Sequence, residues 1–237
     1  FIEYGGTMTA MRERLRTLPD MQRAVTRLTM GHGGPRGLAV LETGLRVAKT
    51  VVGLIRQIKT NALVAALPAR MDGLLEMLVA PLALADRLAP ALADELPFLA
   101  RDGGFVRVGY DQGLDEVRQL RDESRRLMAA LQARYAEETN IASLKIKHNN
   151  VLGYHVDVRA THADKLMQSE LFIHRQTTAQ TVRFTTTELA EMERDMAAAA
   201  GKALAKEMEI FEALCDAVTA CAVEIGDAAT ALAELDV

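Results

Sequence analysis

Apolar residues recur every three or four positions along two long stretches of the sequence, which is the spacing of one face of a helix. The first stretch runs from Asp111 to Asn140, and the second covers residues 187–237. A helix of about 48 residues in the second stretch would be about 72 Å long at 1.5 Å per residue. An apolar stripe of that length must be covered by another element, so we expect the two helices to pair as a coiled coil or bundle.

The residues that we expect on the inward faces of these two helices share this spacing. In the first helix they are Leu114, Val117, Leu120, Leu127, Leu131 and Tyr135. In the second helix they are Leu189, Met192, Met196, Leu204, Met208, Phe211, Leu214, Val218, Cys221, Ile225, Leu232 and Leu235.

Residues that break helices are concentrated in the first half of the chain. All six prolines lie at or before Pro97, and only three of the 16 glycines lie beyond Gly113. Since Pro and Gly cost a helix interior about 3 and about 1 kcal/mol, we expect several short helices in this region. The predicted elements are a helix over 7–30 with a kink at Pro19, a connection at 31–35, helices over 38–55, 62–79 and 82–93, a turn at 101–104 and an extended piece at 105–108.

Between the two long helices the pattern changes to a period of two, which is typical of strands. Residues 144–148 and 154–159 alternate, and the residues between them have turn chemistry. Residues 172–175 and 181–185 are β-branched and aromatic, so they predict two more strands. A short helix is expected from Thr161 to Gln168, with Thr161 as its N-cap.

These patterns predict a mainly α fold with a minor α+β insert. We expect a multi-helix core plus a long antiparallel helical arm that carries a small β-rich tip. The expected domains are a helical core over residues 1–110, the two long helices over 111–140 and 187–237, and a β-rich segment over 141–186 inserted between them.

Charge is distributed unevenly along the chain. The whole chain has a net charge of -4, whereas residues 141–186 contain six Lys or Arg against three Asp or Glu, which is a net charge of +3. Amide and hydroxyl side chains are also frequent there. Cations and neutral donors on a rigid surface are typical of contacts with a phosphate backbone. From charge alone, a solvated β module with incidental lysines remains the alternative.

Histidines and aromatic residues of the same segment favour structural roles. Four of the five histidines lie there, but their spacings of 7, 7 and 12 residues match no zinc pattern. Tyr154, Phe172 and Phe184 are expected in the core of the segment rather than as base-stacking surfaces.

Composition excludes several classes of protein. A chain that is 49% hydrophobic and 25% charged is neither a disordered tail, nor a collagen-like repeat, nor a polytopic membrane protein. The start FIEYGG has no signal-peptide pattern and no initiating Met, so we expect a piece cut from a longer protein. Cys215 and Cys221 would lie about 9 Å apart on one helix, beyond disulfide reach, and are expected to be buried apolar residues in a reduced, cytoplasmic setting.

The sequence contains no catalytic motif that we recognise. Gly31 to Gly37 is glycine-rich, but it lacks the Lys–Ser/Thr pair of a Walker loop. The motifs G-x-S-x-G and H-E-x-x-H, and G-x-G-x-x-G in a βαβ setting, are absent. We therefore expect no catalytic residue, no metal site and no cofactor site in this chain, and an unrecognised hydrolase is the least favoured hypothesis.

Several short motifs occur in the order and with the spacing of a known family. They are Leu18-Pro19-Asp20-Met21, Gly34-Pro35-Arg36, Arg101-Asp102-Gly103-Gly104, Gly109-Tyr110-Asp111, Leu114-Asp115-Glu116, Leu144-Lys145-Ile146, Gly153-Tyr154, Arg175-Gln176-Thr177, Arg183-Phe184 and Ala231-Leu232-Ala233-Glu234-Leu235-Asp236-Val237. Together they resemble the MutS family of bacterial DNA mismatch-repair proteins over nearly the whole chain.

The resemblance implies a lever (core) region with a clamp region inserted between its two long helices. Such clamps touch the backbone of duplex DNA without reading sequence, and the lever couples them to an ATPase. The family's mismatch-recognition motif and its ATPase would lie outside this chain, so ATP and Mg would belong to the parent protein. Expected partners are double-stranded DNA, a second copy of the parent protein in a homodimer, and a MutL-type repair partner, with no membrane. The expected location is the bacterial cytoplasm, in association with the nucleoid.

The resemblance also suggests which residues contact DNA. The turn Asn149, Asn150 and Val151 matches the family's DNA-facing clamp turn, and Arg175 to Gln180 matches a second contact segment. The expected DNA-binding residues are Lys145, Lys147, Asn149, Asn150, Val151, Arg175, Thr177, Gln180 and Arg183. Some relatives have a Lys-Asn pair where this chain has Ala179-Gln180, and Lys147 is expected to compensate for the missing cation.

A second hypothesis from a different class is a helical arm that acts as a protein-interaction scaffold, with no nucleic-acid role. It predicts indifference to DNA and a stable protein partner. Binding to DNA that depends strongly on salt would favour the first hypothesis.

Overall fold

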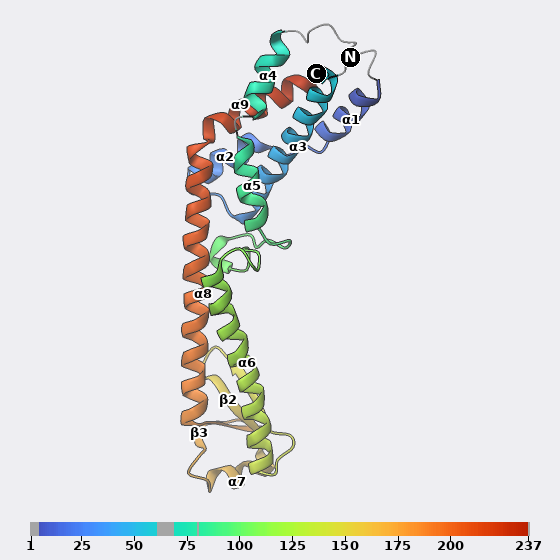
Figure 1. Ribbon diagram of the computed structural model, residues 1–237. Coiled ribbons are helices and arrows are strands. Elements are labelled where there is room, and N and C mark those ends of the chain that lie inside the picture. Colours follow the sequence, from blue (N-terminus) through green and yellow to red (C-terminus); the bar gives the residue numbers. More distant parts are fainter. Residues whose placement is uncertain (1–4, 61–68, 80, 237) are drawn as a thin grey trace. The chain divides into compact units, whose positions relative to one another are not determined.

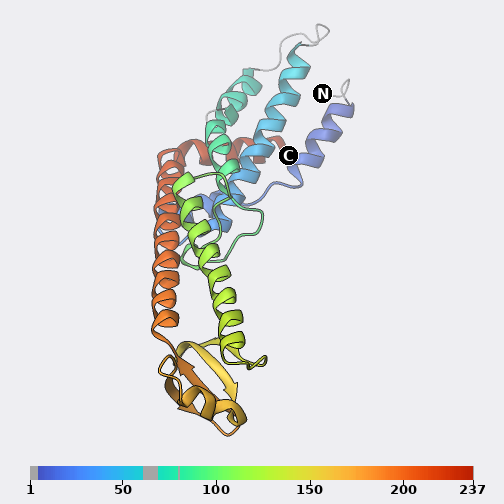
Figure 2. The same ribbon diagram turned by 60° about the horizontal axis from the view of Figure 1, so that its bottom comes forward.

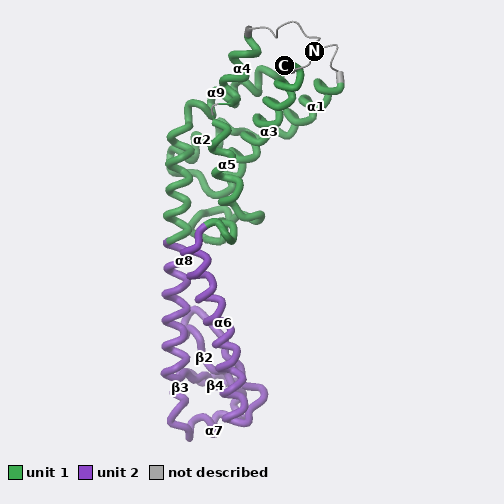
Figure 3. The backbone as a smooth tube through the Cα atoms, viewed as in Figure 1, with its two compact units in different colours: residues 1–110, 206–237 green, residues 111–205 purple. Residues whose placement is uncertain are grey.

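The computed structural model describes residues 5–60, 69–79 and 81–236, which belong to two compact units (Figure 3). Unit 1 consists of residues 1–110 and 206–237, and unit 2 consists of residues 111–205. The predicted fold class is confirmed, because the chain is mainly helical with one small antiparallel sheet (Figure 1). The division into a core, two long helices and an inserted clamp stays a prediction. Residues 62–68 of the helix predicted over 62–79 lie outside the described residues.

Unit 1 is built from helices that pack around α3. The elements are α1 (Gly5–Leu15), α2 (Met21–Thr29), α3 (Pro35–Thr60), α4 (Ala69–Val79), α5 (Leu82–Ala91), a short 3₁₀ turn (Ala100–Asp102), the C-terminal part of α8 (Thr187–Ala220) and α9 (Ala222–Asp236). α3 contacts α1, α2, α4 and α5. Its residues Leu38, Leu41 and Leu45 are completely buried, so α3 forms the centre of this unit's core.

Residues 7–30 form two helices, whereas the sequence predicted one helix with a kink. α1 ends at Leu15 and α2 begins at Met21. Pro19 lies between them, and proline both lacks an N–H and disfavours helical geometry in the residue before it. Asp20 then caps α2, since its Oδ1 accepts a hydrogen bond of 2.9 Å from the backbone N–H of Arg23. A side-chain cap of this kind stabilises a separate helix start.

The continuous helix predicted for the C-terminal stretch is also wrong, because it is interrupted at Cys221. α8 ends at Ala220 and α9 begins at Ala222. Neither Pro nor Gly marks this break. The physical reason is tertiary packing, since α9 lies against α2 and α4 and buries its own apolar residues there. These buried residues are Ile225, Ala228, Ala231 and Leu232.

The two cysteines are less buried than the sequence predicted. Cys215 and Cys221 are free thiols, and both are half-buried. Burial, together with the nearby carboxylates of Asp216 and Glu212, raises the pKa of the Cys215 thiol to about 11. The thiol is therefore protonated at neutral pH and poorly reactive.

The segment after α5 is held in unit 1 by a buried carboxylate. The backbone N–H of Phe105 donates a hydrogen bond of 3.2 Å to Oε2 of Glu207, which is 4% exposed. The ring of Phe105 meets that of Phe211 edge-on, with 5.7 Å between the centroids. Val106 forms an antiparallel bridge with Leu92, which confirms part of the extended piece predicted at 105–108.

Unit 2 combines α6 (Gln112–Glu138), a four-stranded sheet, α7 (Ala163–Met167) and the N-terminal part of α8. The strands are β1 (Lys145–Asn149), β2 (Gly153–Arg159), β3 (Ile173–Thr177) and β4 (Thr181–Thr185). All neighbouring strands are antiparallel, in the order β1-β2-β4-β3. Figure 2 shows the strands with α7 beside them. The four predicted strands are thus confirmed.

The N-cap predicted for the short helix is wrong. α7 begins at Ala163 with His162 in the cap position, and no side chain caps it. Thr161 lies instead within a 3₁₀ turn over Ala160–His162. Because the 3₁₀ turn occupies these residues, α7 begins later in the chain than predicted.

One face of the sheet forms the core of unit 2 with the helices. Val156, Val158 and Phe184 from the strands pack with residues of α6, α7 and α8. Phe172 and Phe184 are buried, as predicted, and Tyr154 is partly buried against the same cluster. Tyr135 of α6 is buried too, and its hydroxyl lies 2.7 Å from Oγ1 of Thr186. These contacts fix the sheet on the helices.

The inward face of α6 differs from the predicted stripe. Leu120 and Leu127 are 57% and 53% exposed, whereas Met128 is buried. Alternating steps of three and four from Leu114 pass through 117, 121, 124, 128, 131 and 135, so the face leaves out both leucines. In α8, Leu204 is also exposed, while the neighbouring Ala203 is buried. The spacing of apolar residues alone did not distinguish the buried stripe through Met128 from the overlapping stripe that contains Leu120 and Leu127.

Candidate nucleic-acid interface

The face of the sheet opposite the core carries polar side chains, because side chains alternate between the two faces of a strand. We call this set the polar face. It consists of Lys145, Lys147, Asn149, His155, Asp157, Arg159, Gln176, Thr181, Arg183 and Thr185. The register places Lys145 and Arg183 beside Asp157 on the two neighbouring strands. The polar face therefore has four cations and a single carboxylate among the described residues.

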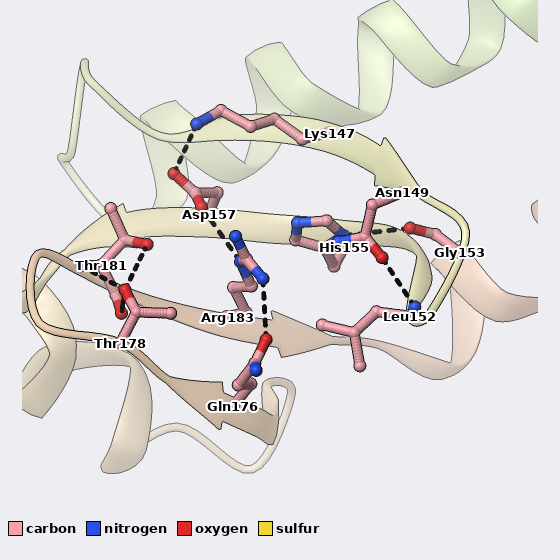
Figure 4. Close-up of polar contacts among 10 residues, drawn as sticks. All are labelled: Lys147, Asn149, Leu152, Gly153, His155, Asp157, Gln176, Thr178, Thr181 and Arg183. Atoms are coloured by element: carbon pink, nitrogen blue, oxygen red, sulfur yellow. Dashed lines mark hydrogen bonds and ion pairs between the residues drawn. The ribbon is translucent and has the colours of Figure 1, made fainter.

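Two of the four cations are paired with that carboxylate (Figure 4). Nζ of Lys147 donates a hydrogen bond of 2.8 Å to Oδ1 of Asp157. Nε of Arg183 lies 3.6 Å from Oδ2 of Asp157, an ion pair that is too long for a hydrogen bond. Nη1 of Arg183 donates a hydrogen bond of 2.7 Å to Oε1 of Gln176. Lys147 and Arg183 are thus held by neighbours within the sheet.

Asp157 is only 6% exposed, yet it is ionised at neutral pH. Burial by itself raises the pKa of this carboxyl group, but the hydrogen bond and the charge of Lys147 outweigh burial, and Thr181 and Arg183 add to them. The net result is a pKa below the usual value. Because the folded-state pKa is lowered, the carboxylate stabilises the fold above about pH 4, and this contribution is lost as the pH falls further.

The turn between β1 and β2 is organised by Asn149. Its Oδ1 accepts hydrogen bonds of 2.9 Å from the N–H of Val151 and 2.8 Å from the N–H of Leu152. The side-chain oxygen is therefore occupied within the turn. Asn150 is exposed, and Val151 is 90% exposed at the tip. The turn therefore carries two amide side chains and one exposed apolar side chain.

The turn between β3 and β4 is closed by hydroxyl groups. Oγ1 of Thr178 donates to the carbonyl of Thr181 at 2.9 Å and accepts from its N–H at 3.0 Å. Thr177 is exposed, with its Oγ1 2.9 Å from Nε2 of His174, and Gln180 is exposed as well. The turn is therefore held by hydrogen bonds, and its residues 177–181 include polar side chains but no cation.

Arg175 lies at an irregularity of the edge strand β3. The register shifts between His174 and Gln176, so Arg175 has no partner residue on β4. Such a bulge bends an edge strand and re-aims the side chain that it carries. Arg175 is exposed, as are Lys145 and Arg159. These three cations make no hydrogen bond or ion pair with any side chain that the structure describes.

The two turns lie at opposite ends of the sheet (Figure 4). The 149–153 turn joins the end of β1 to the start of β2, whereas Arg159 at the far end of β2 is opposite Thr181. Six steps of about 3.3 Å along β2 give a separation of about 20 Å. The polar face fills this distance, so the predicted residues form one elongated surface rather than a single point.

The structure divides the predicted site residues into three groups. Asn149, Asn150 and Val151 form one end, and Lys147 and Arg183 lie in the middle on Asp157. The other end and the β3 edge carry Lys145, Thr177, Gln180 and Arg175. Sequence reasoning left out Arg159, which lies on the polar face. The period of two along β2 could have found it, because Arg159 is two positions after Asp157.

Gly153 ends the first turn in a conformation that only glycine adopts easily. Its φ is +68°, and a Cβ atom there would overlap the carboxylate of Glu193 on α8. That carboxylate accepts a hydrogen bond of 3.1 Å from the N–H of Tyr154. The close contact of Glu193 with Gly153 and Tyr154 therefore holds the start of β2 against α8.

Replacing Gly153 by Ala should lower the free energy of unfolding by about 1–3 kcal/mol, from backbone strain and the displaced Glu193 contact. Thermal or urea unfolding measures this loss. Gly73→Ala is the matched control, because Gly73 lies in α4 with open space around it. Equal stability of the two variants would show that Gly153 needs no special conformation.

Comparisons with known proteins place the sequence in a family. Residues 109–202 match the model of MutS family domain IV. The chain is 51% identical over 97% of its length to the DNA mismatch repair protein MutS of Dinoroseobacter shibae, and 49% identical over 97% to that of Rhizobium meliloti. The chain belongs to the MutS family. It is also 48% identical over 98% of its length to MutS of Nitrobacter winogradskyi. It spans about a quarter of the length of these relatives.

The family assignment confirms the resemblance carried by the short motifs, which lie along nearly the whole of this chain. Within the part of the chain that the structure describes, no group of His, Cys, Asp and Glu side chains is arranged to hold a metal ion. None of the described helices is both long and apolar enough to cross a bilayer.

Proposed function

We propose that this chain binds the backbone of duplex DNA without reading its sequence, through the polar face and the two turns of unit 2. The observation that carries the proposal is the polar face itself, where Lys145, Lys147, Arg159 and Arg183 surround one carboxylate. Arg175 adds a fifth cation at the adjacent edge. Cations, amides and hydroxyls without a stacking aromatic surface suit phosphate contacts rather than base contacts.

The length of the surface suits a double helix. Phosphates on one strand are spaced about 3.4 Å along the helix axis, so about 20 Å corresponds to about six of them. A duplex that lies along β2 would reach both turns and pass over the polar face. The rigid turns and the sheet hold these groups in place before DNA arrives, which reduces the entropy lost on binding.

In the parent protein we propose that the chain is the lever and clamp part of a mismatch-repair ATPase, and that it couples DNA binding mechanically to nucleotide turnover. α8 supports this role, because it runs from unit 2 into unit 1 without a break. We also propose a homodimer, a MutL-type partner, a cytoplasmic location near the nucleoid and no catalytic role. The glycine-rich stretch Gly31–Gly37 is followed directly by Leu38 and Ala39 rather than by the Lys–Ser/Thr pair of a Walker loop, so this stretch does not fit ATP and Mg²⁺.

Fluorescence anisotropy with labelled duplexes tests DNA binding by this chain. The logarithm of the association constant should fall linearly with the logarithm of the salt concentration, because phosphate contacts release counterions. Perfectly paired and mismatched duplexes should bind alike, since backbone contacts carry no sequence information. An affinity that does not change with salt would contradict the proposal.

The interaction-scaffold hypothesis has one observation in its favour, the exposure of Leu120 and Leu127 on α6. These residues are seven positions apart and share a helix face. A partner protein that covers them should be captured equally well with and without nuclease treatment. Loss of the captured protein after nuclease treatment would favour the DNA-binding proposal.

A further inference from the structure

Asp157 is an unusual residue for a surface that binds a polyanion. It lies in the middle of the polar face, and it is the one carboxylate among the described residues of that face. Its side chain is buried, whereas Lys147 on the neighbouring strand keeps half of its own surface exposed. A buried, ionised carboxylate at the centre of a cationic surface calls for a function of its own.

The contacts of Asp157 resemble those that a phosphate group would make. Oδ1 accepts from Nζ of Lys147 at 2.8 Å, and Oδ2 faces Nε of Arg183 at 3.6 Å. Two oxygens of one anion thus engage a Lys and an Arg from the two flanking strands. An ionised acceptor of this kind forms charge-assisted hydrogen bonds similar to those of phosphate.

We propose that Asp157 acts as an internal substitute for a DNA phosphate, which occupies Lys147 and Arg183 and weakens the binding of DNA to the polar face. The inference rests on the proposed DNA binding and adds a residue that moderates it. Lys147 and Asp157 together carry no net charge, so this pair adds nothing to counterion release. The affinity of the surface is then set mainly by Lys145, Arg159 and Arg175, which have no such partner.

Two features decide against a supporting role for Asp157. A carboxylate that only positioned Arg183 would hydrogen-bond it, but Nε of Arg183 is buried and makes no hydrogen bond. Gln176 already positions the guanidinium through the 2.7 Å bond to Nη1. The short contact of Asp157 is instead with Lys147, whose ammonium would otherwise be available to a phosphate.

Asp157→Asn is the direct test, because it removes the charge but keeps the shape and one hydrogen-bond acceptor. Lys147 is half exposed and Nη1 of Arg183 keeps its hydrogen bond to Gln176, so each cation keeps either solvent exposure or a hydrogen-bond acceptor. We expect the slope of log K against log salt to steepen by about 0.9, because one more cation becomes available to phosphate. Since the lines for the two proteins converge near 1 M salt, this change corresponds to about eightfold tighter duplex binding at 0.1 M salt. Anisotropy titrations over a range of salt concentrations measure both quantities.

Asp164→Asn is the matched control, since Asp164 is an exposed carboxylate of α7 in the same unit. The same change of charge there should alter the affinity by at most about twofold, because exposed charges are screened. Equal effects of the two substitutions, or weaker binding by Asp157→Asn, would overturn the proposal.

The double variant Lys147→Met/Asp157→Asn removes the whole pair and therefore preserves the net charge. Because Gln176 still holds the guanidinium of Arg183, we expect the salt slope of this variant to equal that of the unaltered chain. A slope flatter by about 0.9 would mean that Lys147 contacts phosphate despite Asp157, and this result would overturn the inference alone. If the unaltered chain shows no salt-dependent duplex binding, both the proposed function and this inference fail.

Discussion

Neutralising Arg159 and Arg175 together should lower the affinity of this chain for duplex DNA by about 60-fold at 0.1 M salt. Each lost phosphate contact flattens the plot of log K against log salt by about 0.9, so two contacts flatten it by about 1.8, and the two lines converge near 1 M salt. The variant Arg159→Gln/Arg175→Gln should leave the fold intact, because both side chains are exposed and make no hydrogen bond or ion pair with another described side chain. Arg183 is left in place, since its loss would leave Asp157 with one cation.

The control for this variant removes the same charge elsewhere in unit 2. Arg126 on α6 and Arg194 on α8 are exposed residues outside the polar face. Arg126→Gln/Arg194→Gln should therefore keep the salt slope of the unaltered chain. Anisotropy titrations at several salt concentrations compare the three proteins. If both double variants flatten the slope equally, the binding reflects overall charge and the polar face is not the interface.

The sequence predicted the elements of the fold well where local chemistry determines them. Gly153 marks the end of a predicted turn, because positive φ acts through the residue itself. Pro19 also carries a local signal, but it was predicted as a kink and the structure has a helix boundary there. The break at Cys221 has no such local signal, since it depends on where α9 packs. The same limit explains Leu127, which has the right spacing for the core but lies beside the buried Met128.

The candidate site was predictable as a region but not as an arrangement. Net charge located the cations in residues 141–186, and the period of two placed Lys145 and Lys147 on one face of a strand. Strand order is not local, so the sequence did not show that β2 lies between β1 and β4. That order brings Asp157 between Lys147 and Arg183. Whether a cation is available to DNA thus depends on a cross-strand partner that spacing cannot reveal.

The continuity of α8 matters for the proposed coupling, and Gly201 is the position at which to test it. α8 covers Thr187–Ala220, while unit 2 ends at residue 205 and unit 1 resumes at residue 206. Gly201 is exposed, and a Cβ atom added there meets nothing within 4 Å. Substitutions at this residue therefore act on the backbone of the helix and leave side-chain packing unchanged.

Gly201→Pro should destabilise α8 by about 3 kcal/mol or more, because proline removes a backbone hydrogen bond and its ring clashes with the preceding turn. Gly201→Ala should have the opposite effect and stabilise the helix by up to about 1 kcal/mol. If the continuous helix couples the two units, Gly201→Pro should also split one unfolding transition into two, whereas Gly201→Ala should keep it single. Differential scanning calorimetry measures both the stability and the number of transitions. A single transition in Gly201→Pro, at an unchanged temperature, would show that α8 does not link the units energetically, and the mechanical part of the proposed function would then lose its support.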